Sequence, residues 1–185
     1  EIEYIVYLGR KEKDDIEAKV ISVQKVEGSD HLNLCKIDDG GVRPGVDRDE
    51  NGFIQVVCGA ANVRAGIFVA WLPPESIVPE TFGSSDEFEL SARKLMGNMS
   101  NGMIASLREL GLGEEHDGIL EIDPSVFSKE LAPGDSFAAT FELNDYLLEV
   151  ENKSLTHRPD CFGIIGFARE VAGILGRKFE NPDWF

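Results

Sequence analysis

Basic residues are scarce in this sequence. Its 185 residues include 18 lysines and arginines against 34 aspartates and glutamates, so the formal net charge is −16 at pH 7. A surface of this sign repels phosphate, which argues against a protein that coats nucleic acid through a general positive field. A local basic strip, or a partner subunit that makes most of the phosphate contacts, is compatible with this charge.

Cysteine is also scarce, and long hydrophobic runs are missing. The three cysteines, Cys35, Cys58 and Cys161, are far apart and odd in number, which argues against a disulfide framework and fits a reducing cytoplasm. No apolar run reaches the length of about 20 residues that a membrane-spanning helix needs, and no signal peptide is apparent. The chain opens at Glu1 in a strand-like run. We therefore expect a piece of a longer cytoplasmic protein with no membrane partner.

The sequence offers no recognisable set of metal ligands and no catalytic nucleophile. His31, Cys35 and Cys58 lack the paired spacing of a zinc site, such as Cys-x-x-Cys. Ser106 and His116 are not part of a nucleophile-elbow pattern. We expect these residues to have core or turn roles, with no catalytic residue and no metal site in this chain.

Short apolar runs separated by turn residues fill most of the chain. A polar stretch rich in Pro and Gly, residues 42–52, predicts a long loop among them. The runs that predict strands are residues 2–10, 18–26, 32–41, 53–60, 66–74, 117–124 and 132–143. Many short strands with turns between them favour a small closed β-barrel.

The pattern changes near Asn144. Residues 146–154 predict one more strand, and residues 163–178 carry apolar side chains at helical spacing, which gives the helix a broad apolar face. We expect Asp160 to cap this helix at its N-terminus and Arg158 to form a salt bridge. The predicted fold class is therefore mainly β with an α/β flank.

Three stretches carry a resemblance to a known family, and they follow one another as GSDHLNLCKIDDGG, IQVVCGAANVRAGIFVAWLPP and GNMSNGMIASLRELGLGEEHDGILEI. They resemble the tRNA-binding OB-fold module of several aminoacyl-tRNA synthetase components and of free-standing tRNA-binding proteins. The continuation LLEVENKSLTHRPDCFGIIGFAREVAGILG resembles the segment after this module in the β subunit of bacterial phenylalanyl-tRNA synthetase. The matches cover roughly residues 16–178. One departure is His157, where the family commonly has Asn.

The resemblance implies an OB-fold barrel inserted into a small α+β domain. The barrel would span residues 16–143, and residues 1–15 and 144–185 would form the small domain, with their two apolar strands paired. By resemblance, the parent enzyme joins phenylalanine to tRNA(Phe) with ATP and Mg²⁺. It works as an α₂β₂ assembly whose aminoacylation site lies in the α subunit. This chain would be a non-catalytic tRNA-binding or structural portion of the β subunit, without a cofactor of its own.

The stretch VVCGAANVRAG, residues 56–66, indicates where RNA would be contacted. Small residues after a core strand let the backbone turn sharply and leave room for a close neighbour. Asn62 and Arg64 would then stand at the rim of the barrel, where Arg offers a fork for phosphate and Asn offers both a donor and an acceptor. The tRNA-binding candidates are Asn62, Arg64, Arg93, Lys94 and Arg108.

Other interpretations of these residues stay open at this point. Asn62 could instead cap a turn and Arg64 could pair with a surface acid, and the other three candidates could be ordinary solvated charges. The chain could also be a free-standing tRNA-binding module, although such a module does not need residues 144–178. A purely structural module that never touches RNA is a third possibility, and the charge of −16 favours it.

Overall fold

The computed structural model describes residues 2–181 of the chain. Contacts divide the chain into two compact units. The barrel unit comprises Tyr7–Tyr146, and the flanking unit joins Glu1–Val6 to Leu147–Phe185. The predicted limits after residues 15 and 143 therefore differ from the observed ones by several residues. The insertion of a barrel into a small α+β domain stays a prediction.

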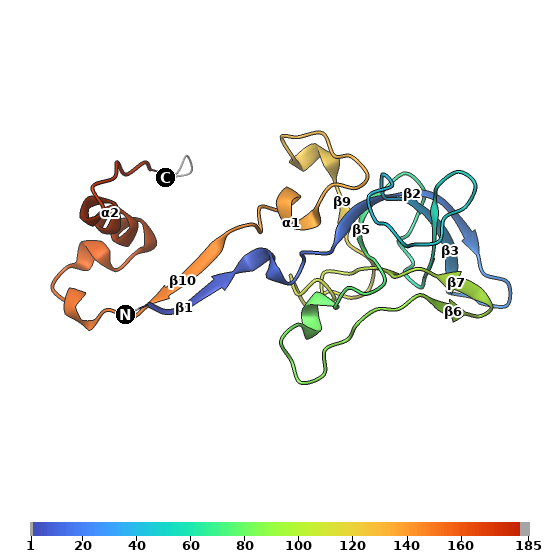
Figure 1. The fold of residues 1–185 in the computed structure, drawn as a ribbon, viewed down its shortest axis with the longest axis horizontal. Coiled ribbons are helices and arrows are strands. Elements are labelled where there is room, and N and C mark those ends of the chain that lie inside the picture. Colours follow the sequence, from blue (N-terminus) through green and yellow to red (C-terminus); the bar gives the residue numbers. More distant parts are fainter. Residues whose placement is uncertain (1, 182–185) are drawn as a thin grey trace. The chain divides into compact units, whose positions relative to one another are not determined.

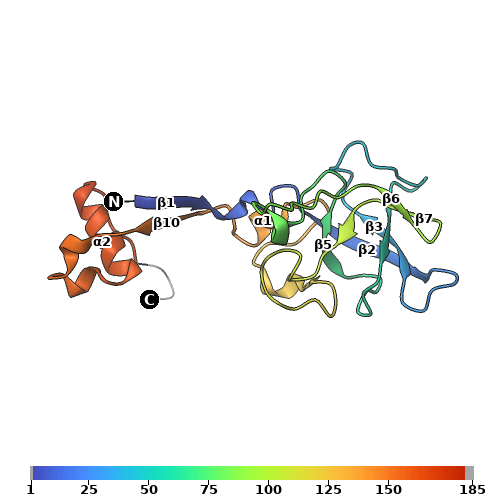
Figure 2. The same ribbon diagram turned by 90° about the horizontal axis from the view of Figure 1, so that it is seen from below.

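A six-stranded antiparallel sheet forms the framework of the barrel unit (Figures 1 and 2). Its strands pair in the order β4-β3-β2-β5-β8, and β9 also pairs with β5. The strands are β2 (Ile16–Lys25), β3 (Asn33–Asp38), β4 (Ile54–Cys58), β5 (Phe68–Leu72), β8 (Met103–Ile104) and β9 (Glu121–Ile122). The predicted predominance of short strands is confirmed.

Hydrogen bonds join β4 to the segment before β8, so the two ends of the sheet meet. The side-chain amide of Gln55 donates to the carbonyl of Met99 at 2.8 Å, and the backbone carbonyl of Gln55 accepts from the N–H of Asn101 at 2.9 Å. The N–H of Val57 donates to the hydroxyl oxygen of Ser100 at 3.0 Å. Closure of this kind leaves fewer unpaired strand edges. The result is an OB-like barrel: the run of short strands predicted a small closed barrel, and the family resemblance implied its OB type.

Strand β5 is buried on both faces and separates two cores. All five of its residues are buried. Val69 and Trp71 belong to the core inside the barrel, while Phe68, Ala70 and Leu72 belong to a second core. Successive side chains of a strand point to opposite faces, which explains this alternation. Each fully buried large side chain stabilises the fold by about 1.5–3 kcal/mol, so β5 contributes to both cores.

Strands β6 (Arg93–Leu95) and β7 (Asn98–Ser100) form a separate two-stranded hairpin. Arg93 pairs with Ser100 in the register and Lys94 with Met99. The hairpin turns at Met96 and Gly97, both of which have positive φ angles, of 46° and 81°. Because β7 continues into the segment that closes the barrel, the hairpin is attached to the barrel wall.

The predicted strand over residues 132–143 is wrong, because its centre is the short helix α1 (Phe137–Thr140). The Ser136 hydroxyl caps this helix by accepting from the N–H of Ala139 at 3.4 Å. The rings of Phe137 and Phe141 stack with their centroids 4.3 Å apart, at the i, i+4 spacing that places side chains on one face of a helix. Capping and burial of Phe137 therefore outweigh the local strand pattern.

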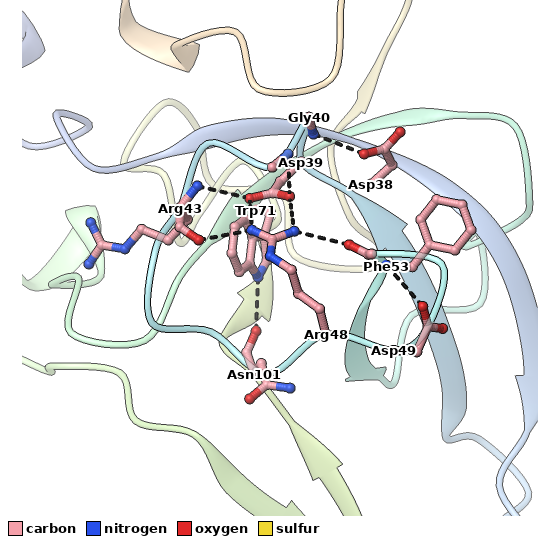
Figure 3. A network of polar contacts seen from close by, with 11 residues as sticks. Asp38, Asp39, Gly40, Arg43, Arg48, Asp49, Phe53, Trp71 and Asn101 are labelled. Atoms are coloured by element: carbon pink, nitrogen blue, oxygen red, sulfur yellow. Dashed lines mark hydrogen bonds and ion pairs between the residues drawn. The ribbon is translucent and has the colours of Figure 1, made fainter.

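The loop predicted over residues 42–52 is present, and a buried ion pair anchors it (Figure 3). The carboxylate of Asp39 is completely buried and accepts from both terminal nitrogens of Arg48, at 2.5 and 2.8 Å. It also accepts from the N–H groups of Gly41 and Arg43. Burial alone would raise the pKa of Asp39, but these hydrogen bonds outweigh it and hold the pKa below its usual value.

Strand β1 (Ile2–Tyr7) pairs with β10 (Tyr146–Val150), so the predicted pairing of the two apolar strands is confirmed (Figure 1). Helix α2 (Ile164–Ile174) follows. We predicted that a sheet would cover its apolar face from Ile164 to Leu175. None of the residues of α2 is buried, however, and Ile164 is 90% exposed. Ile165, Phe167 and Val171 on this face are half-buried, so the described residues cover the face only in part.

Asp160 does not cap α2, contrary to the prediction. It lies in the 3₁₀ turn Pro159–Cys161, and the N-cap of α2 is Gly163. The extra turn moves the start of the helix three residues further along the chain. The predicted salt bridge of Arg158 is confirmed, because its guanidinium contacts Asp160 at 2.8 Å and Glu170 at 2.9 Å. The ion pairs of Arg158, in place of an Asp160 cap, therefore join the 3₁₀ turn to helix α2.

Candidate nucleic-acid interface

Asn62 joins two segments of the barrel unit that are far apart in sequence. Its side-chain amide donates to the carbonyl of Ile119 at 2.9 Å, and its amide oxygen accepts from the N–H of the same residue at 3.0 Å. Gly118 is required beside it, since a Cβ there would lie 2.6 Å from the Asn62 amide oxygen. Asn62 therefore fastens the Gly118–Ile119 segment to the connection between β4 and β5, in place of the turn cap that the sequence allowed.

Arg64 forms a two-pronged ion pair with Glu121 of β9. Nη1 donates to one carboxylate oxygen at 2.8 Å, and Nη2 donates to the other. The alternative that Arg64 pairs with a surface acid is thus confirmed. Both side chains are substantially exposed, at 58% and 39%. Such a pair contributes only about 0.2–1 kcal/mol, so a phosphate could compete for the guanidinium.

Arg108 also pairs with a surface acid, through a single hydrogen bond. Its Nε donates to a carboxylate oxygen of Glu80 at 2.9 Å, and both side chains are exposed. Glu80 lies in the 3₁₀ turn Pro79–Thr81. Three of the five candidates, Asn62, Arg64 and Arg108, therefore already have protein partners for their polar groups.

Arg93 and Lys94 differ from the other three candidates. Both lie on β6 and are exposed, and neither forms an ion pair with any residue that the structure describes. They are adjacent in sequence, so their side chains point to opposite faces of the hairpin. Among the candidates, these two cations are the ones available to phosphate without breaking an ion pair inside the protein.

A cavity of about 420 Å³ lies next to this hairpin in the barrel unit. Arg93 lines it together with Gly118 and Ile119, the segment that Asn62 holds. Phe88 also lines the cavity, and we did not identify it from the sequence as a site residue. The available signal was a large aromatic residue inside the acidic stretch DEFEL, residues 86–90. Such clefts of a few hundred Å³ are the usual size of sites for small ligands.

The cysteines do not supply a reactive group in this region. Burial raises the pKa of Cys35 to about 12 and also raises that of Cys58. Thiols with raised pKa values carry almost no thiolate near neutral pH and are poor nucleophiles and metal ligands. Among residues 2–181, no group of three or more His, Cys, Asp or Glu side chains is arranged to hold a metal ion. No described helix is long and apolar enough to cross a membrane.

Residues 17–129 match a family model described as a putative tRNA-binding domain. The chain belongs to this tRNA-binding domain family. The family segment begins inside β2 and includes the connection that holds Asn62 and Arg64, the β6–β7 hairpin and the cavity. The predicted resemblance to this OB-fold module is therefore confirmed.

Longer relatives extend the match beyond this tRNA-binding domain. The phenylalanine–tRNA ligase β subunit of Desulfotalea psychrophila is 39% identical over 164 residues, which cover 88% of this chain and 17% of that protein. The corresponding subunit of Synechococcus sp. strain CC9605 is 35% identical over 184 residues, covering 99% of this chain and 21% of that protein. The chain thus spans about a fifth of the length of these curated relatives. These matches favour the β-subunit interpretation over a free-standing module.

A solved structure of a Naegleria gruberi RNA ligase with PPi also aligns with this tRNA-binding domain protein. The alignment covers 77% of this chain and 37% of that chain, with a TM-score of 0.43 and 12% identity. A likeness at that level has no bearing on the function of the chain.

Proposed function

We propose that this chain is the non-catalytic tRNA-binding and structural portion of the β subunit of a phenylalanine–tRNA ligase, which attaches phenylalanine to tRNA(Phe) with ATP. The observation that carries the proposal is the extent of the match to β subunits. It covers up to 99% of the chain, whereas the family model ends at residue 129. The parent enzyme would use Mg²⁺ with ATP and would join this β subunit to an α subunit in a cytoplasmic α₂β₂ assembly.

Within this function, we assign the first tRNA contact to the β6–β7 hairpin. Arg93 and Lys94 are exposed cations without ion-pair partners among the described residues. A phosphate bound there displaces no internal salt bridge. Contact at Arg64 or Arg108 would first have to break the pair with Glu121 or Glu80. Asn62 would then serve RNA binding indirectly, by positioning the segment at Ile119.

The test is aminoacylation of tRNA(Phe) by the complete parent β subunit assembled with its α subunit. Reversing both charges, with Arg93→Glu and Lys94→Glu, should raise KM for tRNA severalfold and leave kcat unchanged, because neither residue is at a reaction centre. The dependence of log KM on log salt should also become shallower, by about one unit for each phosphate that the variant no longer neutralises. Arg177→Glu with Lys178→Glu is the matched control, since it reverses an adjacent, exposed Arg–Lys pair elsewhere.

A second candidate, a structural module that packs against other domains and leaves RNA alone, is favoured by two observations. The net charge is −16, and three of the five predicted contacts are engaged within the protein. An unchanged KM for tRNA and an unchanged salt dependence in the Arg93→Glu, Lys94→Glu enzyme would select this structural role.

A further inference from the structure

The cavity beside the hairpin has small residues at one side. Gly59 and Ala60, which follow β4 directly, both line it. A Cβ at Gly59 would have Leu32 Cδ2 at 3.7 Å as its only neighbour within 4 Å. Gly59 is exposed and has no positive φ angle, so neither packing nor backbone conformation requires glycine at this position. The small residue keeps space open in the cavity.

An exposed aromatic ring lies on the cavity wall. Phe88 lines the cavity, yet 47% of this residue remains exposed to solvent. A ring that is buried neither in a core nor against another ring is available for stacking. Unpaired nucleic-acid bases stack on such rings, and RNA-binding proteins use this contact to hold single-stranded nucleotides.

The charges around the cavity determine which part of a nucleotide fits inside. Glu89, Glu109 and Asp117 line it, against Arg93 as the one lysine or arginine among its lining residues. Glu109 is held in place because one of its oxygens accepts from both the N–H and the hydroxyl of Ser106. Three carboxylates repel a phosphate, but they accept hydrogen bonds from the amino groups of bases.

We propose that this cavity binds one unpaired RNA nucleotide whose base carries an exocyclic amino group, namely guanine, adenine or cytosine. The base stacks on Phe88 and donates to the carboxylates, while Arg93 contacts the phosphate outside. The proposal rests on the function proposed above, because tRNA is the source of the nucleotide. It also explains why small residues follow β4, since a larger side chain at Gly59 would occupy the place of the base.

The experiment titrates the 185-residue chain with free nucleosides, which separate base recognition from phosphate attraction. Amide chemical shifts are followed by NMR for guanosine, adenosine, cytidine, uridine and, separately, inorganic phosphate. We expect saturable shifts at Gly59 and Phe88 with the three amino-bearing nucleosides and binding several-fold weaker with uridine. Phe88→Ala should weaken binding by about fivefold or more, the usual effect of removing one stacking ring. Phe162→Ala, at another exposed ring, should leave it unchanged.

Gly59→Leu is the decisive variant because it fills the cavity without demanding a new backbone conformation. It should abolish the shifts while the remaining amide spectrum stays that of the folded protein. Gly173→Leu, at an exposed glycine of α2 with open space around it, is the matched control. Equal binding of uridine, unchanged binding by Gly59→Leu, binding of phosphate alone or the absence of any shift would overturn the proposal.

The two proposals fail in different ways. If no nucleoside binds but Arg93→Glu with Lys94→Glu still raises KM for tRNA, the nucleotide pocket is refuted and the tRNA-binding role stands. If nucleosides bind and Gly59→Leu abolishes their binding, yet neither the charge reversal nor Gly59→Leu changes KM in the parent enzyme, the pocket exists and the tRNA-binding role is refuted.

Discussion

The barrel unit and the flanking unit bury their apolar residues to very different extents. In the barrel unit, β5 alone places five consecutive residues in two cores, and Trp71 is completely buried. In the flanking unit, helix α2 has an apolar face but no buried residue. The barrel is therefore stabilised by its own buried cores, whereas the described residues cover the apolar face of α2 only in part. Substitutions should consequently be costly in the first unit and nearly neutral in the second when the chain is studied alone.

Trp71→Ala should have the largest effect on stability. The side chain fills the barrel core, and its indole N–H donates to the carbonyl of Asn101 at 2.9 Å. Truncation creates a cavity and leaves a carbonyl without its donor, which costs about 3–5 kcal/mol. Urea unfolding of the 185-residue chain measures this change in stability. A cost below about 1 kcal/mol would mean that the barrel core is packed far less tightly around Trp71.

Arg48→Met should have the next largest effect. Removing the guanidinium leaves the fully buried carboxylate of Asp39 without its charged partner, which destabilises strongly. Since 23% of the Arg48 side chain is exposed, water partly compensates, and we expect about 2–3 kcal/mol. The double variant Asp39→Asn, Arg48→Met should recover part of this stability in the same unfolding assay. No recovery would show that the cost comes from the missing packing of the Arg48 side chain.

Stability should fall as the pH rises through the neutral range, because the start of the barrel unit contains buried acids. Burial, together with the carboxylates of Glu12 and Asp14, raises the pKa of Asp15 to about 8. Neither carboxylate oxygen of Asp15 has a hydrogen-bond partner among the described residues. Burial raises the pKa of Glu17 to about 7; Asp135 adds to this, and Thr140 and Lys129 oppose it.

The sign follows from proton binding. Between the unfolded pKa values near 4 and these native values, the folded state binds more protons than the unfolded state, so stability decreases with rising pH. We expect a decrease of about 1–2 kcal/mol between pH 7 and pH 8, measured by urea unfolding at both pH values. Asp15→Asn should flatten this dependence, and Asp14→Asn, at a neighbouring acid, should change it less. A stability that rises over this range would contradict the assignment.

The smallest effects should come from exposed groups in both units. Arg64→Ala breaks the exposed pair with Glu121 and should cost about 0.2–1 kcal/mol. Ile174→Ser, at a position that is 75% exposed on α2, should stay within about 0.5 kcal/mol. The same Ile174 substitution should matter in the assembled parent enzyme if another part of it covers α2. A cost above about 1 kcal/mol in the isolated chain would show that α2 is covered within these residues.

Local patterns were sufficient to predict most elements. All barrel strands except β8, the polar loop and helix α2 follow from alternation, turn residues and helical spacing within about 10–15 residues. The pairing of β1 with β10 followed from a resemblance, since two apolar strands at opposite ends of the chain carry no signal of each other. The strand predicted around α1 was wrong because a single helical turn is too short to show a helical period in the sequence. A cap and the buried Phe137 stabilise this turn.

The sequence by itself determined which residue types could contact RNA, namely an Asn, three Arg and a Lys near the rim of a small barrel. Only the tertiary structure decided how they are used. Asn62 and Arg64 each find a partner 57 residues away, and Arg108 finds one 28 residues away. The cavity likewise combines Gly59, Phe88 and Asp117 from separate segments. Such contacts depend on strand order and on chain closure, which bring distant segments together, and no local pattern of residues encodes these distances.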